Sequence, residues 1–414
     1  MNLIIIGRKK LFEKIKYLLK SFYDNPEIYF FDSSTYALKS GRSNFSETKR
    51  ILLKKPSAKI ILASENSEAK LITPLLKKIH SKEVFFIPNH FYPIISSISN
   101  INDILFDVDV SKPRLDYVEF HITDHCNLKC KGCGHFSNIE EEKIFANYES
   151  LVNDLKRLKK LFWGIEKIRL MGGEPLLNPE LPKFVAVSRE IFPDSDIRVV
   201  TNGLLIPKIN DSLVQSMKQT NTGFDISQYP ATEKKVNTIL STLKQKQIEY
   251  IISPSIQEFS KAKTLEPVND KSTSFWNCDS RHCHHLRDGM LATCPLPILS
   301  KKINSKYDLK FPTNEVYKIH EEIDAWKLYD ELINKPLELC SYCTWPKNYE
   351  WEIGTKNSAN LQDWVIPLDE IPMLKSKFKY SRKNIKTKLR DSLSEYPIIK
   401  EYVKKVYSTF RKKR

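Results

Sequence analysis

Eight cysteines are the residues best suited to chemistry in this chain, and they form two groups. Cys126, Cys130 and Cys133 stand in one C-x3-C-x2-C stretch, DHCNLKCKGCGHFS, and the other five lie in the last third of the chain. Such clustering indicates metal binding rather than a disulfide framework. Three thiolates on one loop can hold three irons of a 4Fe-4S cube and leave the fourth iron open to a small ligand. A zinc knuckle, with His125 or His135 as its fourth ligand, is the alternative.

Two short motifs follow the cysteine loop. MGGEP occupies positions 171–175 and TNG occupies positions 201–203, each at the end of a predicted strand. Alone, GGEP would be an ordinary turn between a strand and a helix. In this order and separation, however, the three-cysteine loop, GGEP and TNG resemble the radical S-adenosylmethionine (SAM) superfamily across residues 115–265.

The resemblance implies an enzyme with two cofactors, a 4Fe-4S cluster and SAM. In that superfamily the reduced cluster passes one electron to the sulfonium of SAM, and the resulting 5'-deoxyadenosyl radical abstracts hydrogen from a substrate. The methionyl group of SAM chelates the open iron, and Gly172, Gly173 and Glu174 are the residues that would receive its amino group. A small protein such as flavodoxin or ferredoxin is the implied electron donor.

Three further cofactor-binding residues are carried over from the superfamily pattern. Asn202 belongs to TNG, and Ser227 in DISQYP stands where a polar residue at the end of the fourth strand touches the ribose or carboxylate of SAM. Many members have an aromatic residue just before the third cysteine, whereas this chain has Gly132. We therefore assign the adenine contact to Phe136.

A second metal site is predicted from the later cysteines. Cys278-x10-Gly289-x4-Cys294, followed by Cys340-x2-Cys343, resembles the auxiliary-cluster extension called SPASM, or its shorter one-cluster form, called twitch. Four cysteines complete one 4Fe-4S cluster, so the one-cluster form is predicted. A zinc ribbon is the alternative.

Cys283 is a further candidate for this second site. It could replace Cys278 as a ligand, join a three-cysteine first half, or stay free as a redox or proton-transfer group. It belongs to the unusual run His282, Cys283, His284, His285. Because adjacent side chains diverge, these four residues cannot all face one metal, and one or two surface histidines are the alternative interpretation.

Apolar runs predict the elements that position these motifs. Residues 1–110 alternate short buried-type strands with helices, as in a Rossmann-like parallel α/β domain. Their first strand ends at Gly7, but Arg8 and Lys9 follow where a dinucleotide fingerprint needs glycines, so a docking or structural role is favoured. At least five strand-helix units over residues 115–265 predict a partial (β/α) barrel of TIM type, with every motif at the carboxyl end of a strand.

A small cysteine-rich auxiliary domain is predicted at residues 266–350, and basic C-terminal helices at residues 351–414. The formal net charge is +16, and residues 375–414 hold fifteen Lys or Arg against three acidic residues. This tail is interpreted either as a helix packed on the enzyme or as a segment that attaches reversibly to an anionic membrane surface. Nucleic acid is not an expected partner, because no groove-reading motif accompanies the charge.

Localisation and substrate class complete the expectations. No apolar stretch reaches the roughly 7 to 15 residues of a signal region or the roughly 18 of a membrane span, so a cytoplasmic protein, at most peripheral to the inner face of the membrane, is expected. The stretch HITDHCNLKCKGCGHFS behind an α/β front domain resembles radical proteins of bacterial polysaccharide loci. The favoured substrate is therefore a sugar, nucleotide sugar, cyclitol or related glycan that is oxidised or epimerised.

Two other functions fit the sequence less well. Maturation of a ribosomally made peptide is a common task of SPASM-bearing enzymes, but a peptide-leader module of winged-helix type would favour it, and the front domain is predicted to be parallel α/β. A metal-stabilised scaffold without enzymatic activity would require the cofactor motifs to be coincidental.

Overall fold

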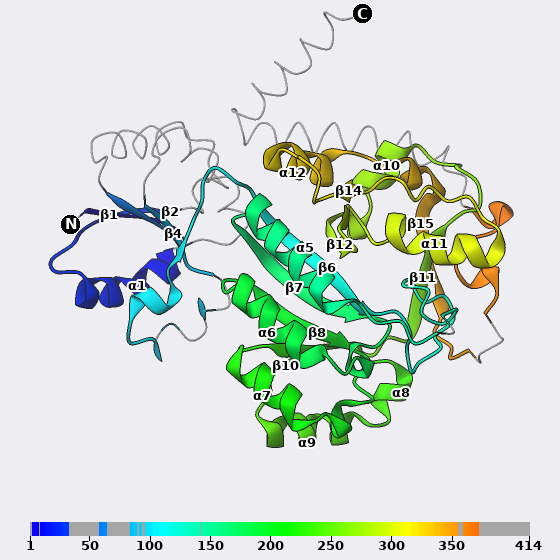
Figure 1. Cartoon of the computed structure of the whole chain (residues 1–414), viewed down its shortest axis with the longest axis horizontal. Coiled ribbons are helices and arrows are strands. Elements are labelled where there is room, and N and C mark those ends of the chain that lie inside the picture. The colour runs from blue at the N-terminus through cyan, green and yellow to red at the C-terminus, as the bar shows by residue number, and fades with distance from the viewer. Residues whose placement is uncertain are drawn as a thin grey trace, which may run out of the picture. The chain divides into compact units, whose positions relative to one another are not determined.

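The computed structural model divides the chain into two units (Figure 1). One unit comprises Met1–Ser111 and Pro372–Arg414, and the other comprises Lys112–Ile371. The structure describes residues 2–7, 9–32, 58–63, 83–88, 91–92, 95, 97–140, 142–354 and 359–371. The basic segment at 375–414 and residues 64–82 of the front domain lie outside the described residues.

The first unit contains a five-stranded sheet in the order β2-β1-β3-β4-β5. Strands β1 to β4 run parallel, and β5 is antiparallel to β4. Helix α1 packs Leu11, Ile15 and Leu19 against Leu3 and Ile5 of β1. The predicted parallel α/β arrangement is confirmed. Its elements are β1 (Asn2–Gly7), α1 (Lys9–Phe22), β2 (Glu27–Asp32), β3 (Lys59–Ala63), β4 (Val84–Phe86), the 3-10 turn η2 (Ile101–Ile104) and β5 (Phe106–Asp107).

The second unit contains an eight-stranded sheet in the order β10-β9-β8-β7-β6-β12-β13-β14. Strands β6 to β10 pair in parallel and alternate with helices, which confirms the predicted strand-helix series. The sheet stays open between its edges β10 and β14. The series consists of β6 (Arg114–Thr123), α5 (Tyr148–Leu161), β7 (Gly164–Gly172), α6 (Leu181–Ile191), β8 (Asp196–Thr201), α7 (Asp211–Gln219), β9 (Gly223–Ile226), α8 (Pro230–Glu233), α9 (Val236–Lys246) and β10 (Tyr250–Ile252).

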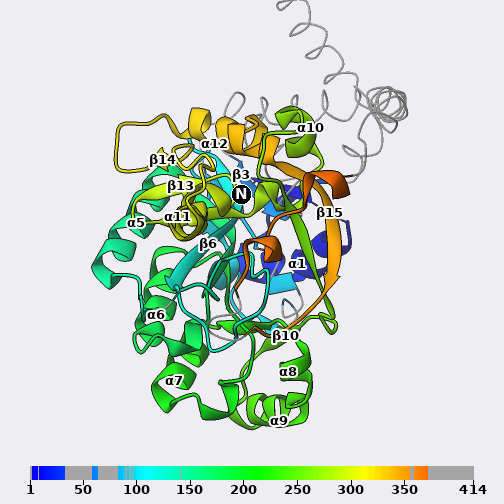
Figure 2. The same ribbon diagram turned by 90° about the vertical axis from the view of Figure 1, so that its right-hand side faces the viewer.

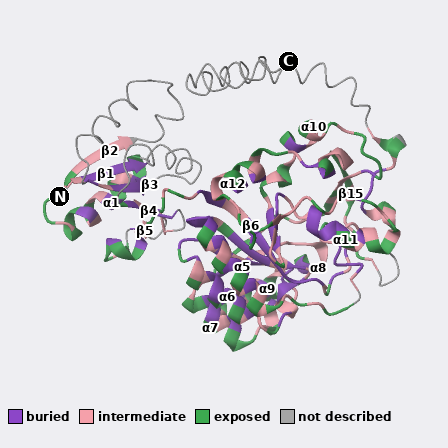
Figure 3. Ribbon diagram, turned by 45° about the horizontal axis from the view of Figure 1, so that its top comes forward, coloured by how far each residue is buried: buried purple, intermediate pink, exposed green. Residues whose placement is uncertain are grey.

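The two faces of this sheet differ in chemistry. On β6, Val118, Phe120 and Ile122 are buried with α5 in the main hydrophobic core, and Figures 1 and 3 show the helices over this face. Side chains alternate along a strand, so the positions between these residues face the other way. On β6 those positions are Glu119 and His121, which makes the inner face of the sheet polar.

The cysteine-rich segment is joined to the same sheet. Strand β12 pairs in parallel with β6, and β13 and β14 follow it in antiparallel register. Strands β11 and β15 form a separate antiparallel pair (Figure 2). The auxiliary domain at residues 266–350 therefore stays a prediction, because three of its strands extend the barrel-type sheet. Residues 258–350 contain β11 (Glu258–Lys263), α10 (Lys271–Trp276), β12 (His284–Arg287), β13 (Met290–Ala292), α11 (Leu296–Tyr307), β14 (Tyr317–Lys318), α12 (Ala325–Asn334) and β15 (Cys343–Glu350).

The second unit continues beyond the predicted start of the tail at residue 351. Its last described elements are the 3-10 turns η7 (Leu361–Asp363) and η8 (Leu368–Glu370). Residues 351–371 thus belong with the unit that carries the cysteines, which corrects the predicted boundary. Among the described residues, no helix is long and apolar enough to cross a membrane.

Candidate metal centre

The cysteine loop starts where β6 ends, at Thr123. Asp124, the next residue, donates its backbone N–H to the carbonyl oxygen of Ile144 at 3.0 Å. Its buried carboxylate pairs with Arg287 of β12 and lies 3.3 Å from the ammonium of Lys302 on α11. The start of the loop is therefore anchored to two elements of the cysteine-rich segment.

The three cysteines of this loop come together in the structure. Burial raises the pKa of the Cys126 thiol, and the nearby Glu174 carboxylate and the Cys133 and Cys130 thiols raise it further. Burial and the neighbouring Cys133 thiol raise the pKa of Cys130 to about 12. Thiols that resist ionisation in this way need a positive charge beside them to become thiolates, and bound iron supplies it.

The spacing of the sulfurs bears on which metal fits. Within the described ranges, no three cysteine sulfurs lie within 4.8 Å of one another. A single zinc ion holds thiolates at about 2.3 Å, so the sulfurs around it must lie close together. Thiolates of a 4Fe-4S cube bind separate irons and stand farther apart. A set of sulfurs too far apart for one zinc ion is compatible with a 4Fe-4S cube.

The GGEP turn packs directly on the cysteine loop. Gly173 donates its N–H to the carbonyl oxygen of Thr123 at 2.7 Å, and Glu174 donates its N–H to that of His125 at 3.0 Å. A Cβ atom at Gly173 would lie 2.1 Å from the His125 carbonyl oxygen. Gly172 approaches Thr123 in the same way. These glycines, which the sequence assigned to the approach of a ligand, let two protein loops approach each other.

Glu174 is fully buried and hydrogen-bonded within the protein. Its Oε1 accepts hydrogen bonds from the Leu176 N–H at 3.0 Å and the Thr201 hydroxyl at 2.7 Å, and its Oε2 accepts one from the Asn202 N–H at 3.0 Å. Burial raises the pKa of Glu174 to about 7, although these hydrogen bonds act in the opposite direction. The carboxylate thus ties the turn to the end of β8. Its role toward the methionyl amine stays a prediction.

Asn202 reaches from the end of β8 to the cysteine loop. Its Nδ2 donates to Oδ1 of Asn127 at 2.7 Å and lies 3.7 Å from Sγ of Cys126. Ser227 follows β9, and its N–H donates to the Thr201 carbonyl oxygen at 2.9 Å. The carboxyl ends of β6, β8 and β9 therefore bring together residues that the sequence assigned to the cluster and to SAM.

Phe136 packs in the hydrophobic core beside the cysteine loop. Its side chain is fully buried, and its ring lies 5.8 Å from the ring of Trp364. Trp364 donates its Nε1–H to the carbonyl oxygen of Cys133 at 2.8 Å. Both rings belong to a hydrophobic cluster with residues of α11. Phe136 therefore supports the cysteine loop from within the core, and its contact with the adenine of SAM stays a prediction.

Sequence reasoning missed two aromatic residues beside the loop. Tyr229 stacks on Trp351, with ring centroids 5.7 Å apart and planes inclined by 16°. Burial raises the pKa of Tyr229, and the thiols of Cys133, Cys130 and then Cys126 raise it further. Tyr229 follows Ser227 by two residues, and this position in the sequence could have identified it as a residue near the site. Trp351 carried no local signal, because its contact depends on how the chain returns after β15.

The later cysteines also gather. Burial raises the pKa of Cys294, and the neighbouring thiols of Cys343, Cys340 and Cys278 raise it further. Burial likewise raises the pKa of Cys340 to about 11 and that of Cys343 to about 12. Cys283 has different neighbours, because the groups that raise its pKa to about 11, after burial, are Glu119 and Cys278. Cys278 is therefore better placed than Cys283 to complete the set.

Lys263 lies between the two cysteine sets. Burial lowers the pKa of its ammonium, while the thiols of Cys343, Cys294 and Cys133 act in the opposite direction. These thiols belong to both sets, and the Cα of Lys263 pairs with that of Cys343 across the β11–β15 ladder. The sequence offered no reason to select this lysine among the many of the chain.

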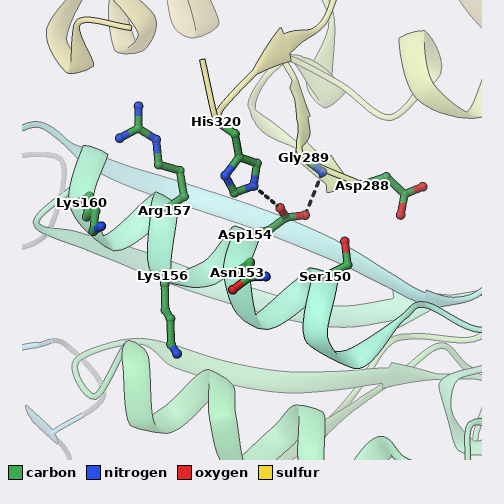
Figure 4. A pocket seen from close by; sticks show the side chains of 9 residues that line it. All are labelled: Ser150, Asn153, Asp154, Lys156, Arg157, Lys160, Asp288, Gly289 and His320. Carbon is green, nitrogen blue, oxygen red and sulfur yellow. Dashed lines mark hydrogen bonds and ion pairs between the residues drawn. The ribbon is translucent and has the colours of Figure 1, made fainter. Parts of the chain in front are cut away.

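A surface hollow of about 460 Å³ lies on the outer side of α5 (Figure 4). Asp154 is buried at its base and accepts hydrogen bonds from the Gly289 N–H at 2.8 Å and from Nε2 of His320 at 2.6 Å. Arg157 donates to the carbonyl oxygens of Ile319 and Glu321. These contacts anchor α5 to the β12–β13 turn, and none of the predicted ligands or cofactor-binding residues lines the hollow.

A parallel strand-helix sheet with three gathered cysteines at the carboxyl end of its first strand is the architecture expected of a radical SAM domain. Residues 120–237 match the sequence model of the Radical SAM superfamily. The chain therefore carries a radical SAM domain, which confirms the domain predicted from the sequence. The SPASM-type extension and the polysaccharide setting stay predictions.

Similar proteins share mainly this domain. The GTP 3',8-cyclase of Alkaliphilus oremlandii (strain OhILAs) is 32% identical over 120 residues, which are 28% of this chain and 37% of that protein. The GTP 3',8-cyclase of Aliarcobacter butzleri (strain RM4018) is 29% identical over 162 residues, 38% of this chain and 43% of that protein. The chain thus spans about two fifths of the length of these curated relatives.

Two solved structures match the chain at low similarity. BtrN in complex with AdoMet and 2-DOIA is 15% identical, with a TM-score of 0.36, and the likeness covers 62% of this chain and 100% of that one. SuiB of Streptococcus suis bound to S-adenosylmethionine is 11% identical, with a TM-score of 0.32, and the likeness covers 67% of this chain and 83% of that one.

Proposed function

We propose that the protein is a radical SAM enzyme whose 4Fe-4S cluster is held by Cys126, Cys130 and Cys133. The cluster, when bound, supplies the electron that cleaves SAM and leads to hydrogen abstraction from a substrate. The observation that carries this proposal is the gathering of the three cysteines at the carboxyl end of β6, in contact with Asn202 and the GGEP turn. Three thiol ligands leave one iron for SAM, as the superfamily requires.

The surrounding residues give this site its shape. Glu174 holds the turn against β8 through three hydrogen bonds, which leaves the turn little freedom to move. Tyr229 and Trp351 cover the loop with stacked aromatic rings. Such a cover excludes water from a reactive site and protects it from side reactions.

We further propose that Cys278, Cys294, Cys340 and Cys343 hold one auxiliary 4Fe-4S cluster. The mutual proximity of their thiols supports this assignment. Lys263 would compensate part of the negative charge that thiolate-bound clusters add to a buried site. An auxiliary cluster near the substrate can accept an electron, which suits a net two-electron oxidation.

The proposed substrate is a sugar, nucleotide sugar or cyclitol. The support is the inner face of the sheet, where polar and charged side chains stand at alternate strand positions that the helices do not cover. A hydroxyl-rich molecule needs many donors and acceptors of this kind. The half-buried side chains of this kind are those of Tyr117, Arg198 and Asp225.

Maturation of a peptide is the alternative. The described strands β1 to β4 of the front unit form a parallel α/β sheet, which is unlike a winged-helix leader module and so favours the sugar. The name GTP 3',8-cyclase belongs to relatives that match over less than half of their length, so GTP enters only as a compound to be tested.

Cluster content and SAM cleavage test the proposal. Anaerobically reconstituted protein should carry about eight irons per chain, and joint replacement of Cys126, Cys130 and Cys133 with Ala should remove about half of the iron and all formation of 5'-deoxyadenosine. Zinc without iron, or unchanged SAM cleavage in the triple variant, would refute the proposal.

A panel of nucleotide sugars, a lipid-linked glycan, GTP and a co-encoded peptide tests the substrate, because only the correct class should stimulate 5'-deoxyadenosine formation.

A further inference from the structure

Three buried side chains meet on the inner face of the sheet, apart from both cysteine sets. Glu119 and His121 stand two residues apart on β6 and therefore share one face. His285 of β12 pairs in register with Glu119 on the neighbouring strand. One donor atom from each of the three residues lies within 4.8 Å of the other two, and Nδ1 of His285 is 2.9 Å from Oε1 of Glu119.

Several donor atoms of this cluster have no hydrogen-bond partner. The side chains of Glu119, His121 and His285 are 4%, 1% and 0% exposed. Both ring nitrogens of His121 and Nε2 of His285 are buried without a hydrogen bond, and the nearest acid to His121 is Asp124, whose Oδ1 is 4.0 Å from Nδ1. Buried nitrogens of this kind are costly unless a ligand satisfies them.

We infer that Glu119, His121 and His285 bind a divalent first-row transition-metal ion. Two imidazoles and one carboxylate are a donor set that such ions take up in proteins. Donors about 2.1 Å from an ion and at right angles to each other lie about 3 Å apart, which agrees with the contact between His285 and Glu119.

Glu119 supplies the negative charge of the cluster. Arg287 and Lys302 are the nearby cations, but Asp124 pairs with both, and Glu140 lies 3.4 Å from Lys302. Because Asp124 pairs with both cations, the negative charge of Glu119 faces the two histidines. Its second oxygen, Oε2, accepts a hydrogen bond from the hydroxyl of Tyr117 at 3.3 Å, which holds the carboxylate in place.

Two other uses of the cluster explain less. A hydrogen bond from His285 to Glu119 would form without an ion, but it leaves both nitrogens of His121 unsatisfied. A direct contact with a sugar-sized substrate is disfavoured, because the three side chains are almost fully buried. An ion would in addition join β12 to β6, and so hold the cysteine-rich segment on the barrel-type sheet.

Binding of Mn²⁺ to the reconstituted full-length protein tests the inference. Mn²⁺ is a hard ion that prefers oxygen ligands to thiolates, so the cysteines compete little for it. With the clusters oxidised and EPR-silent, the signal of free Mn²⁺ reports binding directly. We expect one ion per chain, and at least tenfold weaker binding in His121→Asn and His285→Asn. The matched control is His284→Asn, because His284 neighbours His285 on β12 but contacts the Thr293 carbonyl oxygen instead and should bind as the wild type does.

Failure of the wild-type protein to bind Mn²⁺, or unchanged binding in both variants, would overturn the inference. Iron content and thermal midpoint are measured on every variant, so a folding defect is recognised as such. If the histidine variants fail to fold, Glu119→Gln replaces them, because it removes the charge and keeps the shape of the side chain. SAM cleavage is measured separately, so this inference and the proposed function can fail independently.

Discussion

Replacement of Gly173 with Ala tests whether the GGEP turn and the cysteine loop are packed as described. The added Cβ would lie 2.1 Å from the carbonyl oxygen of His125 and 2.8 Å from that of Asp124. Ordinary contact begins near 3.4 Å, so one backbone must move by about 1.3 Å. His125 directly precedes Cys126, and the movement should therefore displace the first ligand of the cluster.

The expected cost follows from overpacking, which typically destabilises a protein by roughly 1 to 3 kcal/mol. A unit of this size loses roughly 2 to 4 °C in thermal midpoint for each kcal/mol, so Gly173→Ala should lower the midpoint by about 2 to 12 °C. The iron content of the Gly173→Ala variant should fall toward the amount that the proposed auxiliary cluster alone would hold. Formation of 5'-deoxyadenosine should fall with it. This result would differ from the role that the sequence assigned to Gly173, which was contact with the methionyl group of SAM.

Gly134→Ala is the matched control, because a Cβ at Gly134, in the same loop, meets no heavy atom within 4 Å. Iron content, thermal midpoint and SAM cleavage should stay close to those of the wild type. The reasoning would be refuted if Gly173→Ala behaved like the wild type. It would also be refuted if the two variants lost iron equally, since the loop would then tolerate no added side chain for reasons unrelated to the contact with His125.

Three more predictions concern charge. Lys263→Met should lower the reduction potentials of the proposed clusters by tens of mV, whereas Lys263→Arg should preserve them. An EPR-monitored redox titration measures these potentials. If both variants had the same potentials as the wild type, Lys263 would not compensate the charge of the clusters. Glu174 has a folded-state pKa of about 7, above its unfolded value, so folded protein binds the extra proton and its stability should fall as pH rises from about 5 to 7. Glu174→Gln should flatten this dependence, and an unchanged slope of thermal midpoint against pH would contradict the assignment. For the basic tail, full-length protein should float with anionic but not neutral vesicles, less at high salt, whereas a chain ending at Ile371 should stay in solution with its iron; identical behaviour would assign the tail to packing.

Local patterns predicted much of the second unit. Period-2 and period-3.6 apolar runs between residues 115 and 265 predicted strands β6 to β10 and their helices, because each element buries one regular face. The spacing of Cys126, Cys130 and Cys133 predicted one loop, and the structure brings the three thiols together. Asn202 was predicted to lie near these thiols, because parallel strands end at the same edge of a sheet.

The sequence was least informative where a residue has a local environment that only a distant segment creates. Phe136 was assigned to adenine because it is an aromatic residue near the third cysteine, and the structure places Trp364 beside its ring in the core. Gly173 was assigned to ligand approach because glycine permits close contact, and the partner proved to be the His125 backbone. A glycine or an aromatic residue in the sequence indicates close packing, but it does not identify the packing partner.

The sequence by itself predicted the class of domain from the order of its motifs, and the candidate cysteine ligands and strand-helix order from spacing and periodicity, because these features depend on neighbours within a few turns of chain. Tertiary structure decided the pairing of β12 with β6, which places His285 beside Glu119 across 166 residues. It likewise decided the return of residues 351–371 over the cysteine loop, where Trp351 meets Tyr229. Such contacts depend on which buried faces fit one another in three dimensions, and no local pattern records that fit.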